Sequence, residues 1–134
     1  MRSREQVIRD FVQQWLDKAE GDLAAAEILL RAETHDYFPC AFHCQQASEK
    51  FLKAYLVCHQ IEFRKTHDLG ELLKLAAQAE PTLQQELGSC EWLTPFGVEF
   101  RYPGESANKE CAVEAKRLCT YVRKIARSSM RLAT

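Results

Sequence analysis

The stretch from Asp36 to Leu69 constrains the fold of this chain most strongly. From Pro39 to about Gln60 its apolar residues recur with the period of a helix, and proline is favoured in a first helical turn, where its missing N–H has no partner to lose. The sequence therefore predicts one long helix. The residues expected on its apolar face are Tyr37, Ala41, Cys44, Ser48, Phe51, Leu52, Tyr55 and His59.

The opposite face of this helix is polar, apart from Val57. It carries His43, Gln46, Lys50 and Lys53, with Glu49 beside them. Lysine offers a point charge to phosphate, and histidine or glutamine can hydrogen-bond a base or a ribose. The same pattern is also typical of a solvated outer face of a bundle, and the residues alone leave both interpretations open.

Four further helices are predicted around this one. The first spans about Glu5 to Ala32, and its Gly21 suggests a close contact with another helix. A shorter helix follows Asp68, which is predicted as its N-cap with Glu71 as the reciprocal partner. The remaining two run from about Thr82 to a break at Thr94-Pro95, and from about Ala107 to Arg131. The prediction is an all-α fold, in which residues 1–134 form one domain, an up-and-down antiparallel bundle of about five helices.

Composition excludes several classes of protein. No apolar run approaches the roughly 18 residues that a membrane span needs. The N-terminus lacks the apolar region of a signal peptide, so a cytoplasmic location and no membrane partner are expected. The six cysteines are expected to be reduced thiols, most of them packed as small hydrophobic residues.

Charge is distributed unevenly along the chain. Residues 1–100 hold 10 Lys+Arg against 16 Asp+Glu, whereas residues 101–134 hold 8 against 3. A basic face on the last helix would suit RNA or an acidic partner, and an ordinary solvated face is the alternative. That face carries Lys109, Lys116, Lys124, Arg127 and Arg131, with Arg117 and Arg123 at its margins.

Three segments together carry a resemblance to a known family. The run AFHCQQASEKFLKAYLV (41–57), the run KTHDLGELL (65–73) and the triplet Arg101-Tyr102-Pro103 resemble the HEPN domain in order and spacing. The resemblance implies an α-helical bundle, often a homodimer, that binds a nucleotide such as ATP or GTP, or RNA. It also implies a nucleotidyltransferase as partner, in a toxin–antitoxin-like pair, and relates the chain to ribonuclease toxins.

The candidate binding site combines these segments. Its predicted nucleotide- or phosphate-binding residues are His43, Gln46, Lys50, Lys53, His67, Arg101 and Tyr102. Arginine can clamp phosphate and tyrosine can stack on a base. Alternatively, Arg101 pairs with an acid such as Glu49 or Glu99 and Tyr102 fills the bundle end. The basic segment 64–67 is likewise either an anion site at a helix entrance or an ordinary capped helix start.

Catalysis is not expected. Ribonuclease members of the family carry an arginine followed, after four to six residues, by a histidine. Here Arg101 fits the arginine, but the matching positions hold Ser106, Ala107 and Asn108, and no histidine follows His67. The prediction is a non-catalytic binding module without a cofactor. A ribonuclease that uses His67 and a bundle that only binds other proteins are the alternatives.

A metal site is not expected either. Cys40, His43 and Cys44 have a spacing that could hold zinc, but no fourth ligand is evident. Buried thiols beside an outward histidine are the preferred interpretation.

Overall fold

The chain is mainly helical. Its computed structural model describes residues 1–97 and 103–132. Five α-helices and one 3-10 helix follow one another, and these described ranges contain no strand. The elements are α1 (Arg4–Arg31), α2 (Phe38–Cys58), α3 (Leu69–Ala79), α4 (Thr82–Leu87), η1 (Gly88–Gly97) and α5 (Lys109–Ser129). The predicted all-α bundle of five α-helices is confirmed.

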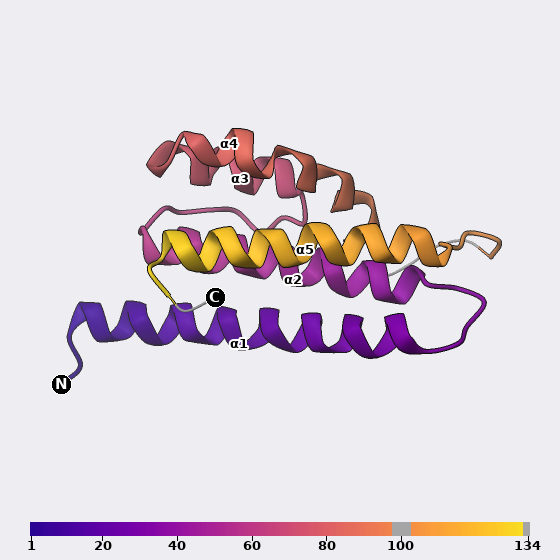
Figure 1. Cartoon of the computed structure of the whole chain (residues 1–134). Coiled ribbons are helices and arrows are strands. Elements are labelled where there is room, and N and C mark those ends of the chain that lie inside the picture. The colour runs from indigo at the N-terminus through magenta and orange to yellow at the C-terminus, as the bar shows by residue number, and fades with distance from the viewer. Residues whose placement is uncertain (98–102, 133–134) are drawn as a thin grey trace.

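Helices α1 and α2 form a long antiparallel hairpin (Figure 1). The start of α1 is fixed by a capping box in which Ser3 and Gln6 bond each other's backbone N–H groups, a signal that the sequence analysis missed. The small and branched side chains of its inner face, including Ala19 and Leu23, are buried. The predicted helix contact at Gly21 is wrong. Gly21 is exposed, and no atom of a neighbouring element lies within 4 Å of the position of an added Cβ.

Helix α5 packs along α2 on another side and runs in the same direction (Figure 1). The two helices can approach closely because the α5 residues at the contact are small. Ala112, Ala115 and Cys119 are fully buried there. The chain can enter α5 in this direction because α4 and η1 first run opposite to α2, whereas α3 runs in the same direction as α2.

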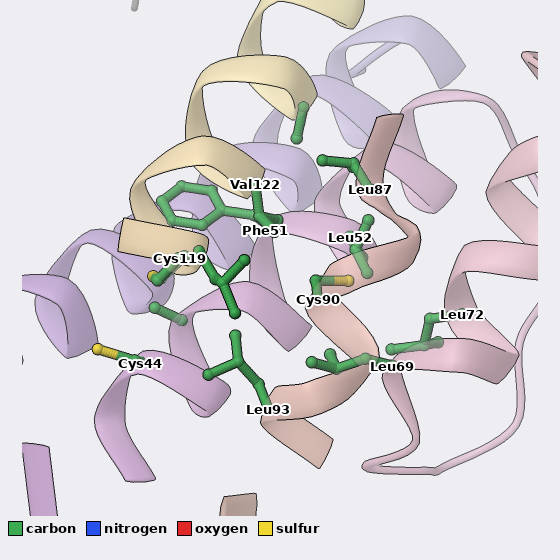
Figure 2. Packing of buried hydrophobic residues seen from close by; sticks show 14 of the residues in the cluster. Cys44, Phe51, Leu52, Leu69, Leu72, Leu87, Cys90, Leu93, Cys119 and Val122 are labelled. Carbon is green, nitrogen blue, oxygen red and sulfur yellow. The ribbon is translucent and has the colours of Figure 1, made fainter. Parts of the chain in front are cut away.

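The α3–α4–η1 segment forms a layer over α2 and α5 (Figure 1). Leu69 and Leu72 of α3, and Cys90 and Leu93 of η1, meet Phe51 and Leu52 of α2 in the core (Figure 2). The α-helix that begins at Thr82 ends earlier than predicted, at Leu87, and continues as a 3-10 helix that includes Pro95. Glycine at position 88 weakens the α-helix, and proline restrains the residue before it, so the tighter helix takes over.

Helix α2 is therefore covered by α1 on one side and by α5, α3 and η1 on the others. Because α2 lies at the centre, its polar residues pack against neighbouring elements. Among the described residues, no helix is both long enough and apolar enough to cross a bilayer.

Candidate functional site

The polar stripe of α2 faces α1 instead of forming a solvated outer face. Of its members, Lys53 is 5% exposed and the neighbouring Glu49 3%, while His43, Gln46 and Lys50 are partly exposed. A charged side chain in such a position must find a partner of opposite charge, since desolvation without one costs several kcal/mol or more. Two carboxylates supply these partners, and each organises one cluster.

The first cluster centres on Asp22 of α1. His43 Nδ1 lies 2.9 Å from Asp22 Oδ1, and Lys50 Nζ donates to Asp22 Oδ2. Asp22 has only 14% of its side chain exposed. Lys50, a predicted phosphate contact, and His43, a predicted contact to a base or ribose, are therefore already bound to a carboxylate from the neighbouring helix.

The second cluster centres on Glu49 of α2. Its Oε2 accepts from Lys53 Nζ at 2.8 Å, and its Oε1 lies 2.8 Å from His67 Nδ1. Glu49 and Lys53 have 4% and 6% of their side chains exposed, whereas His67 has 67%. The buried pair thus presents an imidazole to solvent.

Aromatic rings complete the surroundings of Lys53. Its Nζ lies 5.5 Å from the ring centroid of Trp15 in α1 and 5.8 Å from that of Phe63 in the loop before α3. A cation over an aromatic face gains roughly 0.5–2 kcal/mol, more when water is excluded. Lys53 is therefore held inside the bundle and cannot reach a ligand at the surface without breaking these contacts.

A pair of glutamines ties the second cluster to its surroundings. Gln45 Nε2 donates to the backbone oxygen of His67 at 3.0 Å and approaches Glu49 Oε1 at 3.3 Å. Gln46 Nε2 donates to Gln45 Oε1 at 2.7 Å. A Cβ added to Gly97 would lie 2.7 Å from the Gln45 side chain, so a larger residue at the end of η1 would require this buried amide to move. The predicted residues Gln46 and His67 are thus linked, through the buried Gln45.

The entrance of α3 is a capped helix start. Asp68 accepts from the N–H groups of Gly70 and Glu71, and the N–H of Leu69 donates to Thr94 Oγ1. Since these first-turn donors are satisfied within the chain, they are not available to an anion. The capped start, one of the two interpretations of segment 64–67, is the one observed. Asp68 is the N-cap, as predicted. Glu71 is not its reciprocal partner, because the Asp68 N–H donates to Thr66 Oγ1 and the Glu71 carboxylate accepts from Arg64.

Two predicted site residues, Arg101 and Tyr102, lie outside the described residues. The structure therefore brings together five of the seven candidates, His43, Gln46, Lys50, Lys53 and His67, along the α1–α2 contact and the entrance of α3.

The cysteine positions support the expected thiols. Cys40 and Cys44 are fully buried, and His43 points to Asp22 instead of to them. Hydrogen bonding to Cys119 and Cys40, together with burial, raises the pKa of Cys44, and burial raises the pKa of Cys90 to about 12. Within residues 1–97 and 103–132, no group of three or more ligating side chains has a geometry that could hold a metal ion.

The basic face of α5 is partly neutralised. Arg123 Nε and Arg127 Nη1 lie 2.8 Å and 3.3 Å from the carboxylate oxygens of Glu20 in α1. Arg117 pairs with Glu114 on its own helix, which lowers the pKa of that carboxyl group. Arg123 and Arg127 thus connect α5 to α1, whereas Arg117 pairs within α5.

Three residues of the site were not among the predicted binding residues, namely Asp22, Gln45 and Glu49. Asp22 had a recognisable signal, because it lies three residues after the buried Ala19 and four before the buried Ala26, on the inner stripe of α1. A carboxylate at such a position predicts a cation on the facing helix.

Comparison with known proteins places this architecture in a family. The family model described as HEPN domain matches residues 12–131. The crystal structure of an archaeal HEPN homologue is similar, with a TM-score of 0.72 and 21% identity over 89% of this chain and 97% of that one. Among curated proteins, none matches the sequence. The chain belongs to the HEPN domain family.

Proposed function

We propose that this HEPN domain binds a nucleotide or the phosphate-bearing backbone of RNA and performs no reaction of its own. The observation that carries the proposal is the arrangement around Glu49 and Asp22. It holds the α2 residues and His67 in two polar clusters along one helix, with His67 exposed at the Glu49 cluster. Family membership supports a ligand of this chemistry.

The internal ion pairs change the roles proposed for individual residues. Lys53 is buried and already neutralises Glu49, so it acts as a support and not as a phosphate contact. His67, and to a smaller extent His43 and Gln46, present polar atoms at the surface. Arg101 and Tyr102, proposed from the sequence, would supply the phosphate clamp and the stacking surface.

A non-catalytic role follows from the sequence motif. The position expected for a histidine after Arg101 is occupied by Ser106, Ala107 or Asn108. A ribonuclease would have to use His67, which lies in a different segment. The resemblance to the family also motivates two partners, a second copy of the chain and a nucleotidyltransferase, in a toxin–antitoxin-like pair within the cytoplasm.

The internal pairing also supports a second candidate function. Because the described cations of the α2 stripe are bound to Asp22 and Glu49, the clusters can be explained as elements of stability. The domain would then bind only other proteins.

A titration of the purified protein separates these candidates. Fluorescence anisotropy with a short single-stranded RNA, and calorimetry with ATP and GTP with and without Mg²⁺, are expected to show saturable, salt-dependent binding. His67→Ala and Arg101→Ala should weaken it, whereas Lys74→Ala, which removes an exposed lysine of α3, should not. No binding by the folded protein would favour the protein-only function. Cleavage of the RNA that both His67→Ala and Arg101→Ala abolish would favour the ribonuclease.

A further inference from the structure

His67 is an exposed side chain whose orientation is fixed from inside the bundle. Its Nδ1 lies 2.8 Å from Glu49 Oε1, although two thirds of the side chain faces solvent. A carboxylate only accepts hydrogen bonds, so Nδ1 must carry the proton of this bond. In a neutral imidazole, the lone pair is then on Nε2.

Glu49 is itself held in place. Lys53 binds its other carboxylate oxygen at 2.8 Å, and Gln45 approaches Oε1 at 3.3 Å. Gln45 also donates a hydrogen bond to the backbone oxygen of His67. The imidazole is therefore fixed at both its ring and its backbone, as side chains in precise binding sites usually are.

Two of the charged groups near His67 in sequence, Arg64 and Asp68, have partners within the chain, whereas Lys65 is exposed. Asp68 caps α3, and Arg64 is bound to Glu71. Among the described residues, His67 Nε2 makes no hydrogen bond. The structure thus places one oriented acceptor at this edge, beside an aspartate that already caps α3.

We propose that His67 is a specificity-determining residue that accepts a hydrogen bond from a ribose 2′-hydroxyl, with Glu49 as its positioning residue. The inference rests on the proposed function and narrows it to ribonucleotides. A lone pair attracts a hydroxyl donor and repels the oxygens of a phosphate, and the 2′-hydroxyl is the group by which a protein distinguishes RNA from DNA. Phosphate contacts come from other residues.

The test uses three labelled single strands of one sequence, about 12 nucleotides long, built as RNA, as DNA and as 2′-O-methyl RNA. The 2′-O-methyl strand keeps the oxygen but has no donor. At about pH 8, above the ordinary titration range of imidazoles, the full chain is expected to bind RNA roughly 3–10-fold more tightly than the other two strands. ATP against 2′-deoxy-ATP repeats the comparison for a mononucleotide.

The variants separate recognition from support. His67→Asn retains an N–H donor for Glu49 but is too short to place an acceptor at the position of Nε2, so it should fold normally and bind all three strands equally. Glu49→Gln should reduce the preference for RNA because the amide also permits the other tautomer. Glu71→Gln is the control, because it makes the same change in a carboxylate that binds Arg64 and not His67. This variant should keep the preference for RNA.

Three outcomes overturn the inference. Equal affinity of the unmodified protein for the three strands would leave the proposed function standing and remove the role of His67. An RNA preference that His67→Asn retains would do the same. Binding to none of the strands and to neither nucleotide would overturn the proposed function together with this inference.

Discussion

Glu49 Oε2 lies 2.8 Å from Lys53 Nζ, one turn further along α2, and both side chains are almost completely buried. Trp15 of α1 and Phe63 of the loop before α3 cover the ammonium group of Lys53. Each charge is therefore the main compensation for the desolvation of the other, and removal of one partner exposes the full cost of burying the second.

Lys53→Met should destabilise the protein strongly. Methionine fills a similar volume beside Trp15 but leaves Glu49 with only His67 and Gln45, so we expect a loss of about 3–5 kcal/mol in the free energy of unfolding. Urea denaturation followed by circular dichroism measures it. Lys53→Met combined with Glu49→Leu should cost less than the sum of the two single changes. Additive losses in this cycle would contradict the proposed coupling.

Gly97→Ala and Gly21→Ala should have opposite effects. An added Cβ at position 97 meets the buried amide of Gln45, whose displacement would disturb its bonds to Glu49 and His67, so a loss of stability is expected. The exposed Gly21 has free space around it within α1, and alanine there should stabilise by about 0.5–1 kcal/mol. Thermal unfolding of both variants measures the contrast. Equal shifts would show that Gln45 can move aside without cost.

Asp22→Asn should cost more than Asp17→Asn. Asp22 binds both His43 and Lys50 at the α1–α2 contact, so its neutralisation leaves a partly buried ammonium without its carboxylate, at a cost of about 1–3 kcal/mol. Asp17 is exposed and accepts from Gln13 on its own helix, so its variant should stay within about 0.5 kcal/mol. Urea midpoints at equal protein concentration provide the comparison. Similar midpoints for the two variants would argue against a structural role of the Asp22 cluster.

Two thiols should react before the other four. Cys58 and Cys111 are partly exposed, whereas Cys40, Cys44, Cys90 and Cys119 are buried. A disulfide reagent such as Ellman's reagent should therefore modify two groups in the native protein and all six in denaturant, because the buried thiols are shielded and are not readily ionised. Rapid reaction of all six in native buffer would indicate a more open contact between α2 and α5.

Stability should fall at alkaline pH. Burial raises the pKa of Cys90 from 9.0 to about 12, so between these values the folded protein holds a proton that the unfolded chain has lost. Unfolding then releases protons, and stability decreases as pH rises through this window, by up to about 1.4 kcal/mol per pH unit for one such group. Urea midpoints between about pH 8 and 10.5 should decline less steeply in Cys90→Ala, which removes this thiol. Equal slopes would contradict the contribution of Cys90.

The helices were predictable because their signals are local. The period of α2 and the N-cap at Asp68 are written in adjacent residues, and both are confirmed. The conversion of the fourth helix to a 3-10 helix at Gly88 was not predicted, since its hydrophobic pattern continues to Leu93. Both helix types bury residues three or four positions apart, so the pattern alone does not separate them.

The candidate site was only partly predictable. Periodicity identified the polar face of α2 but could not show that α1 covers it, because a second helix can dock on either side of the first. The contact between His67 and Glu49 depends on the path of residues 59–68, which follow no period. Lys53 was assigned to phosphate binding because sequence alone does not distinguish a surface ammonium group from one that is paired and buried.

The two carboxylate clusters also restrict how α1 and α2 can align along their length. Their apolar stripes repeat with each turn, so a slide of about 5.4 Å would bring similar aliphatic groups together again. Such a slide would separate Asp22 from Lys50 and His43, and would carry Trp15 away from the ammonium of Lys53. The polar layer therefore selects one register among several that aliphatic packing alone would allow, as buried polar residues do in coiled coils.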